Sequence, residues 1–75
     1  MLARKRSVSI SGHRTSFSLE DEFFECLVRL AKTQKISLAS LVNEIDKNRH
    51  RDSNLSSALR LHVLRAAQNG QLSSH

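Results

Sequence analysis

Arg14-Thr15-Ser16-Phe17-Ser18-Leu19 is a short run in which polar and apolar side chains alternate directly before an acidic stretch. Because side chains alternate across a strand, one face of this run is apolar and the other is polar. The apolar face carries Thr15, Phe17 and Leu19, and the polar face carries Arg14, Ser16 and Ser18. A lone strand leaves its backbone groups unpaired. We therefore predict that this strand pairs with the same stretch of a second copy, in an antiparallel ribbon.

The length and charge of the chain limit the classes of protein to which it can belong. The 75 residues make one domain, of a size at which a core built from a single chain is marginal. Dimerisation is a common remedy, so we expect a homodimer. The formal net charge of +5 indicates an anionic partner, with nucleic acid first and an acidic membrane surface second.

The single cysteine, Cys26, excludes an internal disulfide and indicates a reducing compartment. No stretch approaches the ~20 apolar residues that a membrane helix needs. The basic opening of the chain resembles the start of a signal peptide, but no apolar segment follows it. We therefore expect a cytoplasmic protein.

Residues 1–13 are interpreted as a basic arm, because much of the positive charge precedes the first acid, Glu20. Val8 and Ile10 could add a short strand before Ser11 and Gly12 turn or bulge the chain. One alternative is a disordered solubilising tail, and the other is an arm that orders when it grips phosphates. The predicted phosphate contacts in this region are Arg4, Lys5, Arg6 and His13.

Three helices are predicted from apolar residues that recur at helical spacing. The first covers residues 20–33, with acids in its first turn and either a Ser18–Asp21 capping box or Glu20 as its cap. The second covers residues 38–48 behind the N-cap Ser37. The third covers residues 55–68, is capped from within residues 52–54 and is closed by residues 69–70. Residues 71–75 are expected to fray.

The strand, the first helix, a tight turn with a serine cap and the second helix resemble the ribbon-helix-helix DNA-binding family over residues 14–48. The sequence is most similar to a bacterial subgroup with a Gly-His-Arg-Thr-Ser stretch, which here is Gly12 to Ser16. That subgroup also carries a run like residues 54–61. The resemblance implies a mainly α fold with one short N-terminal strand, in an intertwined homodimer with an intersubunit antiparallel two-stranded ribbon. Residues 49–70 would add a connection and a C-terminal helix to this core.

The resemblance also implies which residues meet DNA. The paired strands would enter the major groove, where a two-stranded ribbon fits and base edges differ most. Base contacts would come from Arg14, Ser16 and Ser18, and a phosphate would lie at the start of the second helix, beside Ser37, Leu38 and Ala39. The dimer core would be formed by Thr15, Phe17, Leu19, Phe23, Leu27, Leu41, Val42 and Ile45. Where this family usually has a glycine before the cap serine, this chain has Lys35.

These patterns favour double-stranded DNA as the partner and a small transcriptional regulator or repressor as the function, with dimers that could assemble further on DNA. The alternative is a protein-interaction module, antitoxin-like or a dimerisation adaptor, that docks a protein partner through its C-terminal helix. Leu61 and Leu64 separate the two, because joint exposure would indicate a docking patch. A basic peptide lying on an anionic membrane is a weaker third option.

No pattern in the chain indicates catalysis, a cofactor or a metal. The four histidines lack ligand spacing, and Cys26 has neither a general base nor an oxyanion site beside it in the sequence. We interpret His62 as a packed residue with one hydrogen bond. The acids of the first helix fit a charged first turn better than paired catalytic carboxylates.

Overall fold

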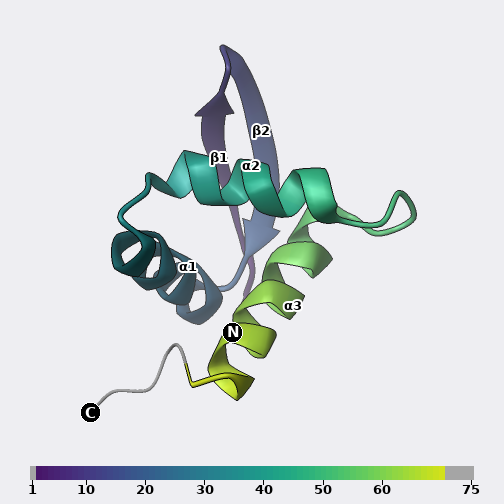
Figure 1. Cartoon of the computed structure of the whole chain (residues 1–75). Helices are drawn as coiled ribbons and strands as arrows, with labels where there is room; N and C mark the ends of the chain where they lie inside the picture. The colour runs from purple at the N-terminus through teal and green to yellow at the C-terminus, as the bar shows by residue number, and fades with distance from the viewer. Residues whose placement is uncertain (1, 71–75) are drawn as a thin grey trace.

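The computed structural model describes residues 2–70 and contains a β-hairpin followed by three helices. Figure 1 shows α2 crossing in front of the hairpin, with α1 and α3 below it. β1 packs against α2, β2 packs against α3, and the helices contact one another. The elements are β1 (Arg4–Ile10), β2 (His13–Leu19), α1 (Asp21–Gln34), α2 (Leu38–Asn48) and α3 (Leu55–Gln68).

The predicted two-stranded antiparallel ribbon is present, but both of its strands come from one chain. β1 pairs with β2 so that Arg4 lies opposite Leu19 and Ser7 lies opposite Ser16. The prediction of a single strand is therefore corrected, because residues 4–10 of the expected basic arm form a strand that pairs with β2 inside the chain. Pairing of β2 with a second copy is not tested by this hairpin. The homodimer itself stays a prediction.

The turn between the strands explains why the hairpin closes within the chain. Ser11 and Gly12 both have positive φ angles, of 51° and 80°. Two-residue turns of this left-handed kind match the twist of paired strands, so they favour a tight hairpin. Glycine adopts this backbone at no steric cost, and no atom lies within 4 Å of the place where a Cβ would stand on Gly12.

The three helices begin and end close to the predicted residues. Ser37 caps α2 by accepting a hydrogen bond from the Ser40 N–H at 3.0 Å, as predicted. Asn54 caps α3 in the same way, through the Ser57 N–H at 2.8 Å. The Ser18–Asp21 capping box does not form, and Glu20 occupies the cap position of α1 without a side-chain cap bond. Its carboxylate instead accepts hydrogen bonds from Arg60 of α3.

Lys35 ends α1 in a left-handed conformation with a φ of 58°. Its backbone N–H reaches the carbonyls of Ala31 and Lys32, which closes the last turn of the helix. The geometry that usually favours glycine is thus kept by a lysine, at some cost in stability.

The hydrophobic core closes within one chain, because α3 covers the apolar sides of the hairpin and the other helices. Six of the residues predicted to form a dimer core are buried in this core, and Thr15 and Phe23 are half-buried. A shared interior is therefore not needed to bury these side chains. The core consists of Phe17, Leu19, Leu27, Leu30, Ala31, Leu41, Val42, Ile45, Leu55, Leu59, Val63 and Ala66.

Within residues 2–70, no helix is both long enough and apolar enough to span a membrane.

Candidate nucleic-acid interface

The face of the hairpin that points away from the core is polar and basic. Alternation along each strand, combined with the observed register, gathers on this outer face the side chains of Lys5, Ser7, Ser9, Arg14, Ser16 and Ser18, all of them exposed. We call this set the outer ribbon face. It contains the three predicted base-contact residues and one predicted phosphate contact, Lys5. Sequence reasoning missed Ser7 and Ser9, because it assigned their strand to an arm.

Arg14 is held across the ribbon by a residue of the neighbouring strand. Its Nε donates a hydrogen bond to the Ser7 Oγ at 3.0 Å. Among residues 2–70, no carboxylate lies within ion-pair distance of Arg14 or Lys5. Both cationic groups are therefore available to an anionic partner.

The two other basic residues of β1 lie on the opposite face of the ribbon. Arg6 donates to the Asp21 carboxylate and to the Leu19 carbonyl, and its guanidinium carbon lies 4.0 Å from the centre of the Phe24 ring. Arg4 also pairs with Asp21, with 3.4 Å between its Nε and the carboxylate oxygen. The structure thus separates the predicted phosphate contacts Arg4, Lys5 and Arg6: Lys5 faces outward, and the arginines tie the ribbon to α1.

Helix α3 braces the joint between β2 and α1. The Ser18 backbone N–H donates to the Ser56 Oγ at 3.0 Å. Arg60 binds the Glu20 carboxylate through two hydrogen bonds, of 2.9 and 3.2 Å. The hydrogen bonds from the Arg60 guanidinium lower the pKa of Glu20. The same run of residues 54–61 that supported the family resemblance therefore fixes the end of the ribbon.

The outer edge of β2 retains unpaired backbone groups. Because the Ser18 N–H points away from β1, the Lys5–Ser18 pair is one that exchanges no ladder hydrogen bonds. Alternation then directs the backbone N–H and C=O groups of Arg14 and Ser16 toward the same outer edge. This edge can accept a further strand.

The remaining predicted phosphate contacts lie at two other places. His13 is exposed at the start of β2, beside the turn. Ser37, Leu38 and Ala39 form the start of α2, where the first backbone N–H groups of a helix lack intrahelical acceptors.

The described residues contain no group of three or more His, Cys, Asp or Glu side chains placed to hold a metal ion. Cys26 is a free, half-buried thiol. Neither observation adds a catalytic arrangement to the interface described above.

A two-stranded ribbon that leads into helices, with its polar face directed outward, defines a small β-ribbon protein of the ribbon-helix-helix class. A ribbon-helix-helix domain model matches residues 3–67, and the chain belongs to this family. Proteins with this domain are generally DNA-binding transcription regulators or antitoxins. Searches of curated proteins and of solved structures gave no match to this chain.

Proposed function

We propose that this chain is a cytoplasmic, sequence-specific DNA-binding protein that acts as a small transcriptional regulator, in the simplest case a repressor. The observation that carries the proposal is the outer ribbon face, which combines Lys5 and Arg14 with four serines and contains no acidic residue. The major groove admits a two-stranded ribbon, and only there do all four base pairs present different patterns.

Arg14 is the residue proposed to read sequence most strongly. Its guanidinium can pair with O6 and N7 of a guanine, and Ser7 steadies it in that role. Ser16 and Ser18 are short side chains that can donate or accept, so they suit close approach but discriminate weakly between bases. Lys5, His13 and the first N–H groups of α2 are proposed to meet phosphates.

A homodimer is proposed to form through the free edge of β2. Antiparallel pairing of Arg14 and Ser16 with their counterparts in a second copy would join two hairpins into one continuous sheet. The outer ribbon faces of both copies would then form one larger basic surface. Because the core is already closed, this dimer requires strand pairing and no exchange of helices.

The direct test is a fluorescence-anisotropy titration of random and genomic duplexes at two salt concentrations. We expect affinity to fall steeply with salt, because neutralised phosphates release counterions, and some genomic duplexes to bind more tightly than random ones. Absent or salt-insensitive binding by the folded protein would contradict the proposal.

A second candidate function is a protein-interaction module, and one observation favours it. Leu61 and Leu64 on α3 are 46% and 50% exposed, so the helix does not bury them in the core as expected of structural residues. The discriminating variant is a Leu61→Ser and Leu64→Ser double substitution. Unchanged DNA affinity in this variant, together with failed DNA-dependent regulation in cells, would assign α3 to a protein partner.

A further inference from the structure

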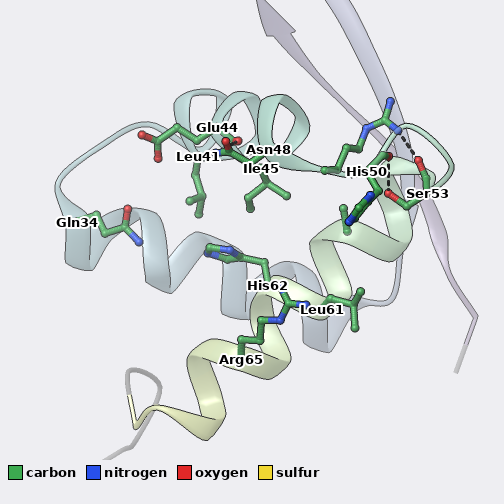
Figure 2. Close-up of a pocket in the computed structure, with 12 residues that line it drawn as sticks. Gln34, Leu41, Glu44, Ile45, Asn48, His50, Ser53, Leu61, His62 and Arg65 are labelled. Carbon is green, nitrogen blue, oxygen red and sulfur yellow. Dashed lines mark hydrogen bonds between the residues drawn. The ribbon is translucent and has the colours of Figure 1, made fainter.

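A pocket of about 290 Å³ lies between α2 and α3, away from the ribbon. Figure 2 shows Leu41 and Ile45 pointing from α2 toward His62 of α3, with Gln34 at the end of α1 on one side. Ala58 and Leu61 line the α3 side. None of the lining residues belongs to the outer ribbon face, so the pocket is separate from the proposed DNA-binding surface.

His62 presents an unsatisfied nitrogen in this pocket. Its Nε2 is buried and has no hydrogen-bond partner within the described part of the chain. The expectation of a packed histidine with one hydrogen bond is therefore wrong for this atom. A buried polar atom without a partner costs free energy, so such an atom in a pocket indicates a place for a ligand atom.

The charges around His62 favour an anionic ligand. Burial lowers the pKa of His62, and Arg65 lowers it further, while Glu44 acts in the opposite direction. The lowered pKa favours the neutral form of the imidazole. Arg65, on the α3 side of the pocket, makes no ion pair with any carboxylate of residues 2–70, so its charge is available to a ligand there; the Glu44 carboxylate, which is also unpaired within those residues, lies on the α2 side.

Two other polar side chains of the lining, those of Arg49 and Asn48, are already engaged. Arg49 pairs with Asp46 at 2.6 Å and also donates to the Ser53 carbonyl. The Asn48 side chain donates to the Glu44 carbonyl at 2.9 Å. Within residues 2–70, Arg65 is thus the lining arginine that no ion pair engages, and it shares the lining with the unpartnered Nε2 of His62.

We propose that this pocket binds a small carboxylate with an apolar body. The carboxylate accepts a hydrogen bond from the Nε2–H of His62 and lies beside the guanidinium of Arg65. The apolar body packs on Leu41, Ile45 and Leu61. The volume is at the low end for small-molecule sites, which suits a ligand built on a single ring or a short chain.

The test is a titration of the ¹⁵N-labelled full chain with sodium benzoate, in which the ring nitrogens of all histidines are followed by NMR. Chloride replaces benzoate in the reference series, so that the ionic strength stays constant. We expect a saturable shift of the His62 ring signals, while the exposed His13 serves as an internal control and does not move. Benzamide, which has the same ring without the charge, should leave His62 unshifted.

Two variants and one matched control decide whether the pocket is responsible. Arg65→Gln and His62→Phe are each expected to weaken benzoate binding about tenfold or more, because each removes a charged or buried hydrogen-bonding partner. Arg51→Gln removes an exposed arginine outside the pocket and should leave the affinity unchanged. Circular dichroism verifies that each variant is folded.

Three outcomes would overturn the proposal. The first is a non-saturable shift shared by His13, which indicates unspecific anion binding. The second is equal weakening in the Arg51→Gln control. The third is a His62 shift that follows protein concentration without benzoate, which would mean that a second copy occupies the pocket.

Discussion

The two faces of the hairpin use the same kinds of residue for opposite purposes. Lys5 and Arg6 are neighbours in the sequence, yet Lys5 is exposed on the outer ribbon face and Arg6 lies beneath the ribbon, against Asp21 and Phe24. On the inner face, the arginines form contacts that hold the ribbon to α1. On the outer face, the cationic side chains of Lys5 and Arg14 remain available to bind a partner. Whether a basic residue stabilises the fold or is available for binding therefore depends on its position along the strand, and not on the number of basic residues.

The difference between the two faces is tested most directly by substituting adjacent residues of β2. Phe17→Ala should reduce the free energy of unfolding by about 3–5 kcal/mol, because the buried ring leaves a cavity in the core. Ser16→Ala, one residue away on the exposed face, should change it by less than about 0.5 kcal/mol. Urea unfolding followed by circular dichroism measures both values. If Phe17→Ala unfolds the protein outright, Phe17→Leu supplies a milder value, and equal effects at the two positions would contradict the assignment of faces.

Arg14→Ala should weaken DNA binding by about 1–3 kcal/mol and relax specificity at one base position, if the guanidinium reads a guanine. Stability should hardly change, because the side chain is exposed and its one side-chain hydrogen bond within residues 2–70 is to Ser7. Anisotropy titrations of the preferred duplex and of single-base variants measure both effects. Arg29→Ala, an exposed arginine on α1, is the matched control, and a comparable loss there would mean that charge alone is responsible.

Substitutions at the neighbours Lys5 and Arg6 should have smaller effects that also differ between the two faces. Arg6→Met should destabilise the fold by about 1 kcal/mol, since it loses a partly exposed ion pair and the contact with Phe24. Lys5→Met should leave stability unchanged but reduce the salt dependence of DNA binding by about one phosphate contact. Unfolding and salt titrations on both variants provide the measurements. The reverse pattern, with Lys5 supporting the fold and Arg6 the affinity, would refute this placement.

The smallest effect concerns the brace between Glu20 and Arg60. Because the pKa of Glu20 is lowered in the folded protein, its contribution is present above the ordinary glutamate pKa. That contribution is lost as the pH falls through the lowered value, where the carboxylate protonates. Wild type should therefore be more stable than Glu20→Gln at pH 7, and the difference should shrink in strongly acidic solution. A difference that grows on acidification would contradict the sign of this linkage, and Glu25→Gln, an exposed glutamate of α1, controls for lost charge.

Local patterns were enough to predict the helices. The bounds of α2 and α3 agree with the predicted residues 38–48 and 55–68, because capping residues and apolar spacing both act within a few residues of the chain. The side of β2 that faces the core also follows from alternation, and Phe17 and Leu19 are buried as expected.

The partner of β2 could not be predicted in the same way. Two alternating runs can pair with each other or with copies of themselves, and the choice depends on whether Ser11 adopts a left-handed backbone that few serines adopt. The brace from α3 was missed for a similar reason, because Ser56 and Arg60 meet residues about forty positions away. Spacing within a helix carries no information on such distant partners.

Alternation, helical spacing and capping chemistry are short-range properties. The amino-acid sequence alone therefore determined which face of β2 is apolar, where the helices lie and that the chain is basic. Folding in three dimensions settled which cations remain free. Register places Lys5 and Arg14 on one face, and the packing of α1 beneath the other face brings Arg4 and Arg6 into ion pairs with Asp21. An ion pair forms only where two side chains are brought within a few ångströms, and that proximity is a product of the packed fold.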